Sequence, residues 1–266
     1  YKRQPIVFSL IMSFCEYDVF SPPRLVWLNN YVRMFTSEPL FFKSLWNTLY
    51  IALSVPLSMA VGLGIAMLLS YEIKGMAVYR TFFYLPAIMP AVAAAILWQW
   101  MFNPQEGILN AFLGHVGIDG PAWLQDQAWS KPAIILMLLW GAGGGMIVWL
   151  AGLKGIPKHL YEAAEIDGAS ILQRIRNITL PQILPVMLIV LILQIIGTFQ
   201  VLVEPLVMTQ GGPNNATLTV LLQVYNYAFK YFWMGEASAM SMMLFLILLG
   251  LTLVYFRITR RFEAEG

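Results

Sequence analysis

The sequence predicts an all-α polytopic membrane protein with about six transmembrane helices, the first of them short or truncated. Its 266 residues are 59% hydrophobic and only 11% charged, whereas soluble domains carry about a quarter charged residues. The missing charge falls in long charge-free runs, and each run reaches the roughly 20 residues that a helix needs to cross a bilayer. These runs are Ser44–Tyr71, Thr81–Gln105, Pro132–Leu153, Gln182–Val203 and Ala237–Phe256.

The first apolar run, Pro5–Cys15, is too short to cross a bilayer, so we expect the first helix to be short or truncated. A cleaved signal peptide is the other interpretation, but no A-x-A-like site follows the run. Two aromatic loop segments, Asn29–Phe35 and Gly107–Leu113, could form short helices at the membrane interface.

Lysine and arginine are unevenly divided between the two sets of loops that alternating helices would create. Because these residues concentrate in cytoplasmic loops, the richer set and both chain termini are predicted to be cytoplasmic. The richer set holds Lys74, Arg80, Lys154, Lys158, Arg174, Arg176, Arg257, Arg260 and Arg261, and the other holds Arg24, Arg33, Lys43, Lys131 and Lys230.

Several functional classes find little support in the sequence. The net charge is +2 without a basic cluster, so we expect no nucleic-acid partner. Cys15 is the only cysteine, and His115 and His159 are the only histidines, so we expect no metal site. No G-x-x-x-x-G-K-[ST] loop occurs, so we expect no ATP site in this chain. With two histidines, one cysteine and no paired carboxylates inside the apolar runs, we also expect no cofactor and no enzymatic activity. The GAGGG string at Gly141–Gly145 favours close helix packing or a kink.

The segment 156–181 is strongly charged, although it lies between two long apolar runs. Ile156-Pro157 is typical of a helix start, and Lys158–Ile166 is predicted to be helical. One face would be small and partly apolar, and it would comprise Leu160, Ala163, Ala164 and Ile166.

Gly168 is expected to turn the chain, because glycine is the usual residue at positive φ. A second helix would follow, with Ile171, Ile175 and Ile178 on one face. A connector resting on lipid headgroups would share this amphipathic pattern. The small patch at Ala163-Ala164 and the exposed acids favour a protein partner, because acids suit an anionic lipid surface poorly.

Two motifs resemble those of permease subunits in bacterial ATP-binding-cassette importers of carbohydrates, of the maltose-F and glycerol-phosphate-A type. The first resembles the cytoplasmic EAA loop and reads Glu162-Ala163-Ala164-Glu165-Ile166-Asp167-Gly168-Ala169, then Ile178-Thr179-Leu180-Pro181. The second resembles the family's G-G-P segment and covers Thr209–Thr217, which reads TQGGPNNAT. The family often has phenylalanine at Ile175, where isoleucine keeps the face apolar. Shorter matches are Trp27–Tyr31, Asn47-Thr48 and Phe102–Asn110, so the likeness covers nearly the whole chain after Pro5.

The resemblance implies a mechanism and a set of partners. Within a single permease domain of residues 1–266, the segment 156–181 would couple to a cytoplasmic ATPase. Two ATPases, which would bind ATP and Mg, would drive this chain and a second permease between inward-facing and outward-facing states. An extracytoplasmic solute-binding protein would deliver the sugar, and the chain would lie in the bacterial inner membrane. The coupling residues would be Glu162, Ala163, Ala164, Asp167, Gly168 and Ala169.

Polar residues within the spans are candidates for the substrate path. The fifth span, Gln182–Val203 when the short first run is counted, offers with its end Thr198, Phe199, Gln200 and Glu204, and Gln200 and Glu204 are expected to share a helix face at i, i+4. The resemblance points to the same region, and also to Gly141 and Gly144, where small residues would leave room for a sugar ring. The alternatives are an interhelical hydrogen bond for Thr198 and a solvated loop acid for Glu204.

The carboxylate of Glu204 favours a neutral sugar over an anionic one, and we expect a disaccharide or oligosaccharide such as trehalose or maltose. The alternative function is an ion-coupled secondary transporter or channel. Such carriers usually need ionisable groups within their spans, and the spans here hold almost none. The sequence therefore predicts a permease subunit of an ATP-driven sugar importer.

Overall fold

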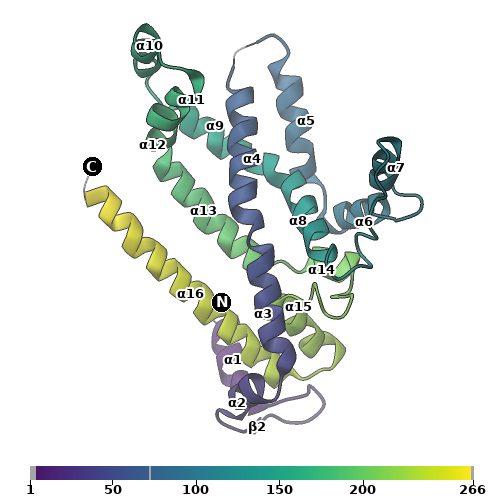
Figure 1. Ribbon diagram of the computed structural model, residues 1–266. Coiled ribbons are helices and arrows are strands. Elements are labelled where there is room, and N and C mark those ends of the chain that lie inside the picture. Colours follow the sequence, from purple (N-terminus) through teal and green to yellow (C-terminus); the bar gives the residue numbers. More distant parts are fainter. Residues whose placement is uncertain (1–3, 72, 265–266) are drawn as a thin grey trace. The chain divides into compact units, whose positions relative to one another are not determined.

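The computed structural model describes residues 4–71 and 73–264, with the backbone alone at residues 258 and 260–264. The side chains of Arg260 and Arg261, which the orientation prediction counts, therefore lie outside the described residues. The regular secondary structure of the described chain is helical apart from one pair of very short strands (Figure 1), so the predicted all-α fold class is confirmed. It divides into two compact units: unit 1 comprises Tyr1–Ala52, Ala91–Ile135 and Ile196–Gly266, and unit 2 comprises Leu53–Pro90 and Leu136–Ile195.

Two helices, α8 (Ser130–Trp140) and α13 (Leu184–Phe199), have residues in both units. Unit 1 contains α1 (Gln4–Ser13), β1 (Cys15–Glu16), β2 (Arg24–Leu25), α2 (Asn29–Thr36), α3 (Pro39–Ile51), α6 (Ala91–Met101), α7 (Ile108–His115), α14 (Val203–Met208), α15 (Val220–Tyr225), η3 (Asn226–Lys230) and α16 (Met234–Ala264). Unit 2 contains α4 (Ser54–Leu69), α5 (Met76–Ile88), η1 (Gly141–Gly145), α9 (Met146–Lys154), α10 (Lys158–Ile166), α11 (Ile171–Arg174), η2 (Ile175–Thr179) and α12 (Leu180–Gln182).

Four of the five predicted spans are long apolar helical segments in the described part of the chain. They cover Pro39–Leu69, Ser130–Lys154, Leu184–Met208 and Met234–Arg257. α1 is an apolar helix of 10 residues at the start of the described chain. The two interfacial helices predicted near Asn29 and Gly107 correspond to α2 and α7.

The remaining predicted span, Thr81–Gln105, is not one straight helix, because α5 and α6 form a bent pair. Met89 ends α5 in an extended conformation, with φ −70° and ψ 137°. The ring of Pro90 explains this break, since the residue before a proline is driven out of the helical region. Charge-free composition predicted an apolar segment here correctly, but it carried no information about where the helix axis changes direction.

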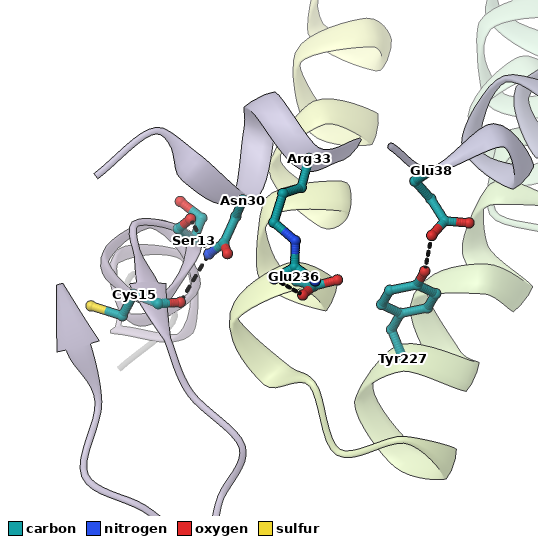
Figure 2. Close-up of polar contacts among 7 residues, drawn as sticks. All are labelled: Ser13, Cys15, Asn30, Arg33, Glu38, Tyr227 and Glu236. Atoms are coloured by element: carbon teal, nitrogen blue, oxygen red, sulfur yellow. Dashed lines mark hydrogen bonds and ion pairs between the residues drawn. The ribbon is translucent and has the colours of Figure 1, made fainter. Parts of the chain in front are cut away.

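Polar contacts connect the first elements of unit 1 to the start of α16 (Figure 2). The Asn30 amide on α2 donates to the backbone oxygens of Ser13 at 3.0 Å and Cys15 at 2.9 Å. On the same helix, Arg33 pairs with Glu236 of α16 at 2.8 Å. Because Asn30 is buried, its two bonds satisfy backbone carbonyls that would otherwise be left unpaired. The segment Trp27–Tyr31, one of the shorter matches to the permease family, therefore has a structural role.

A second polar contact in unit 1 lies beside an apolar cluster of α2, α3, η3 and α16. The hydroxyl of Tyr227 donates to the Glu38 carboxylate that precedes α3. Burial, together with this carboxylate, raises the pKa of Tyr227 above its usual value, so the hydroxyl stays protonated as a donor. Met34, Phe41 and Met240 are buried around the tyrosine ring.

The core of unit 2 joins α4, α9 and α13 to the chain that follows α9. Its buried residues include Leu63 and Ala66 of α4, Trp149 of α9 and Val190 of α13. α4 lies close to the glycine-rich segment η1, because a Cβ at Gly62 would come within 3.1 Å of the backbone oxygen of Ala142. The close packing predicted for the GAGGG string is therefore confirmed.

We expect Gly143→Ala to destabilise the protein and Gly141→Ala to leave its stability nearly unchanged. A Cβ at Gly143 would lie 2.1 Å from the backbone oxygen of Phe83 in α5, whereas a Cβ at Gly141 would meet nothing within 4 Å. Overpacking of this kind costs about 1–3 kcal/mol. Thermal unfolding of the two purified variants, followed by tryptophan fluorescence, measures the difference. Equal midpoints for both variants would contradict the close approach of α5 to η1.

Candidate functional site

The charged segment 156–181 folds as helix α10, a corner, and the helical elements α11, η2 and α12 (Figure 1). α10 covers Lys158–Ile166, as predicted. Pro157 lies immediately before the helix, with φ −62° and ψ 129°. Ile156 is buried in the core of unit 2 and fixes the point at which the segment leaves α9.

Gly168 forms the predicted corner, with φ +72°. The Gly168 N–H donates to the oxygen of Glu165 at 3.1 Å, and the Ala169 N–H donates to the oxygen of Ala164 at 2.9 Å. These two bonds constitute a Schellman motif, which satisfies carbonyls at a helix end. The left-handed conformation explains why glycine occupies this position, since other residues adopt it at a cost.

A capping box begins the second helix, and the sequence interpretation missed it. The Ser170 N–H donates to the side-chain oxygen of Gln173 at 2.7 Å, and the Gln173 N–H donates to the Ser170 hydroxyl at 3.4 Å. The S-x-x-Q pattern at Ser170–Gln173 is the signal that could have found it. The corner therefore satisfies its own backbone groups at both helix ends.

The face predicted for α10 is wrong in one respect, because its members point in different directions. Leu160 and Tyr161 pack against the core of unit 2, and Ala164 is partly buried. Ala163 is exposed, and Ile166 is 88% exposed. Successive residues of an α-helix are about 100° apart, so Ile166 cannot share a face with the inward-facing pair at i and i+4, Leu160 and Ala164.

Tyr161 is the polar anchor of α10. Its hydroxyl lies 2.9 Å from the hydroxyl of Thr179, which is buried near the end of η2. The ring packs in the same core as Ile178 and Leu180. This contact joins the two helical arms of the segment across the Gly168 corner.

The second arm differs from the predicted continuous α-helix. α11 ends at Arg174, and Ile175–Thr179 is a π-helical turn, which changes the angular spacing of its residues. As a result, Ile178 packs on the core, whereas Ile171 is 66% exposed. Leu172 is 75% exposed as well. The prediction of one shared face for Ile171, Ile175 and Ile178 is therefore wrong.

The outer surface of the segment combines acids with exposed apolar side chains. Glu162, Glu165 and Asp167 are exposed, and Glu165 pairs with Arg174 at 3.6 Å. Ile166 and Leu172 add apolar area around the corner. We call this set the corner surface; it comprises Glu162, Ala163, Ile166, Asp167, Ile171 and Leu172. Such a mixture can bind a protein groove that offers both cationic and apolar groups.

The candidate substrate-path residues fall in both units. Gly141 and Gly144 lie in η1 of unit 2. Gly141 is exposed, but an added Cβ at Gly144 would lie 2.7 Å from the Cβ of Ala87, so α5 fills the space beside Gly144. Within the described part of unit 2, space is therefore open beside Gly141 but not beside Gly144, and the role of these glycines in the substrate path stays a prediction.

The other path candidates lie in unit 1, where the helix is interrupted. α13 ends at Phe199 and α14 begins at Val203, so the predicted i, i+4 relation of Gln200 and Glu204 on one helix is wrong. Gln200 is exposed in the break, and Phe199 is buried. Thr198 and Glu204 are partly buried. The N–H groups of Gln200 and Val201 donate to the oxygens of Gly197 at 3.1 Å and Thr198 at 3.2 Å, so the helix ends in a tighter turn. The substrate-path role of these residues stays a prediction.

The G-G-P segment Thr209–Thr217 is hydrogen-bonded to α3, a contact that the sequence interpretation missed. The Asn47 amide of α3 donates to the oxygens of Asn215 at 2.9 Å and Leu218 at 3.0 Å. The Val220 N–H donates to the hydroxyl of Thr48 at 3.1 Å. Asn47-Thr48 and the G-G-P segment each resemble the permease family. In the structure, hydrogen bonds join these two segments to one another.

Residues 39–265 match the family described as "Binding-protein-dependent transport system inner membrane component". The chain belongs to this family. This family member is 39% identical over 258 residues to the probable ABC transporter permease protein YesP of Bacillus subtilis, covering 95% of this chain and 83% of that protein. It is 33% identical over 258 residues to the trehalose/maltose transport system permease protein MalF of Thermococcus litoralis, covering 96% and 87%.

The family fold is also found in a solved structure. A chain in the crystal structure of a bacterial ABC transporter involved in the import of the acidic polysaccharide alginate matches with a TM-score of 0.85 and 24% identity. The match covers 98% of this chain and 90% of that chain. The predicted resemblance to an ABC-importer permease is therefore confirmed, and the protein is an inner membrane component of a transport system.

We expect Gly168→Ala to loosen the corner of this permease more than Gly168→Asn does. The left-handed conformation costs a non-glycine residue about 1–2 kcal/mol, and asparagine tolerates it better than alanine. No neighbouring atom lies within 4 Å of an added Cβ at this position, so the effect isolates backbone strain. Hydrogen exchange of amides in α10 and α11 measures it. Equal protection in the two variants would show that the corner does not depend on the left-handed residue.

Proposed function

We propose that this chain is a permease subunit of an ATP-driven importer of a disaccharide or oligosaccharide, such as trehalose or maltose. The name of the relative from Thermococcus litoralis, a trehalose/maltose permease, supports the substrate class. A second permease would complete the translocation path, and an extracytoplasmic solute-binding protein would deliver the sugar. Both termini would be cytoplasmic, on the side of the lysine-rich and arginine-rich loops.

The corner surface is the observation that carries the proposal. A groove on each of two cytoplasmic ATPases would receive such a segment, and the ATPases would hold ATP and Mg. Glu162 and Asp167 offer charges, Ala163 allows close approach, and Leu172 offers apolar area that is 75% exposed. Interfaces of this kind gain most of their affinity from a few buried apolar anchors.

The inner side of the same segment explains how docking would move the spans. Leu160, Tyr161 and Ile178 pack on a core that includes Trp149 of α9 and Val190 of α13. Closely packed interiors transmit displacement, because they have few voids to absorb it. A push on the corner surface would therefore reach α9 and α13 directly, which is what alternating access by rigid-body movement requires.

We expect Glu162→Ala combined with Leu172→Ser to release the ATPase subunits from the assembled transporter. Loss of an interfacial charge and of an apolar anchor costs about 1–2 kcal/mol each, or roughly 30- to 1,000-fold in affinity for the pair. Co-purification of the ATPases with tagged permease measures the loss. His159→Ala is the matched control, because His159 is another exposed side chain of α10 outside the corner surface. Unchanged co-purification and sugar uptake in the double variant would refute the docking role.

We expect Gln200→Ala to reduce sugar uptake while ATPase association stays normal. An exposed amide beside the helix break can hydrogen-bond sugar hydroxyls, and the loss of one such bond costs about 0.5–1.5 kcal/mol, or roughly 2–10-fold in apparent affinity. Uptake of labelled trehalose and maltose into cells or proteoliposomes measures the change. Gln182→Ala is the control, because Gln182 is an exposed glutamine near the opposite end of α13. Uptake that persists without ATP hydrolysis and follows an ion gradient would instead support a secondary transporter.

A further inference from the structure

Unit 2 contains a groove between α5 and α9 that the coupling segment and the substrate path do not use. Its volume is about 430 Å³. α5 contributes Arg80, Thr81 and Tyr84, and α9 contributes apolar side chains such as Ile147 and Leu150, with Lys154 at its end.

The groove has a cationic end and an apolar end. An added Cβ at Gly144, just before α9, would lie 2.7 Å from the Cβ of Ala87 near the end of α5, and Lys154 at the end of α9 lines the same groove as Arg80 near the start of α5. The two helices therefore run in opposite directions along the groove. Lys154, in the last turn of α9, therefore lies toward the Arg80 end of the groove. Met146 and Ile147 line the other end, about 10–12 Å along the helix from Lys154 at 1.5 Å per residue.

The positive charge at this end is not neutralised within the part of the chain that the structure describes. Arg80 donates from Nε at 3.3 Å and from Nη2 at 2.9 Å to the backbone oxygen of Leu69. A guanidinium carries five N–H groups, so donors remain for another acceptor. The described ion pairs involve Arg33 and Arg174, and neither Arg80 nor Lys154 has a described carboxylate within 4 Å.

The cationic end of the groove is expected to lie at the membrane surface. Lys154 is the last residue of the candidate span Ser130–Lys154. Arg80 and Lys154 both belong to the set of cations whose distribution predicts the cytoplasmic side. At that depth a lysine or arginine head group reaches the lipid headgroups while its stem lies on apolar surface.

We propose that this groove binds an anionic phospholipid of the inner leaflet. Its phosphate would lie between the Arg80 guanidinium and the Lys154 ammonium, and an acyl chain would lie along Ile147 and Leu150. Basic pockets between transmembrane helices on the cytoplasmic side are suited to such head groups. A soluble phosphate compound would leave the apolar length of the groove uncovered, whereas a lipid covers both ends.

The test compares lipid retention by the assembled transporter in nanodiscs of phosphatidylcholine, with and without phosphatidylglycerol. Native mass spectrometry counts the retained lipids. Wild-type protein should retain phosphatidylglycerol preferentially, and Lys154→Gln should weaken that retention about fivefold, the usual effect of one charge near an anionic surface. Lys158→Gln is the matched control, because it removes the same charge from an exposed lysine that does not line the groove.

A second variant separates binding from folding. Arg80→Lys keeps the positive charge but loses the forked donation to Leu69, so it should retain more phosphatidylglycerol than Arg80→Gln does. Equal retention in wild type, Lys154→Gln and Lys158→Gln would overturn the proposal. An Ile147→Cys variant that crosslinks to the second permease would also overturn it, because the groove would then be covered by protein.

Discussion

Packing of Leu160 and Tyr161 into the core of unit 2 is the constraint on which the coupling segment depends. These two side chains fix the rotation of α10, and the 2.9 Å contact of Tyr161 with Thr179 fixes the second arm against the first. Once this inner face is set, helical geometry decides what faces outward. The outward position of Ile166 and Glu162 follows from the positions of Leu160 and Ala164, and so does the composition of the corner surface.

The elements best predicted from sequence are those whose ends are marked by a local signal such as a proline or a glycine. α10 has its predicted bounds because Pro157 precedes it and a left-handed Gly168 follows it shortly after its end. The long apolar spans were also predictable, since charge-free runs of this length rarely serve any purpose other than to cross a bilayer. In these places the local signal and the tertiary structure agree.

The sequence was less informative where tertiary packing decides direction or spacing. Charge-free composition did not reveal that Pro90 would separate α5 from α6. Helical periodicity failed over Ile175–Thr179, because a π-helical turn replaces the α spacing there. It failed again at Gln200, where the chain leaves the helix. The bond between Asn47 and the G-G-P segment joins residues 168 and 171 positions apart, and one sequence offers no signal for such a pair.

The Schellman motif and the capping box have a consequence for the kinetics of assembly. Together they satisfy the backbone at the corner with groups of the segment itself, so the segment needs no partner in order to fold. Association with another subunit would then proceed between preformed surfaces, without the ordering entropy that coupled folding and binding costs. A segment of this kind can dissociate and rebind repeatedly and present the same shape each time.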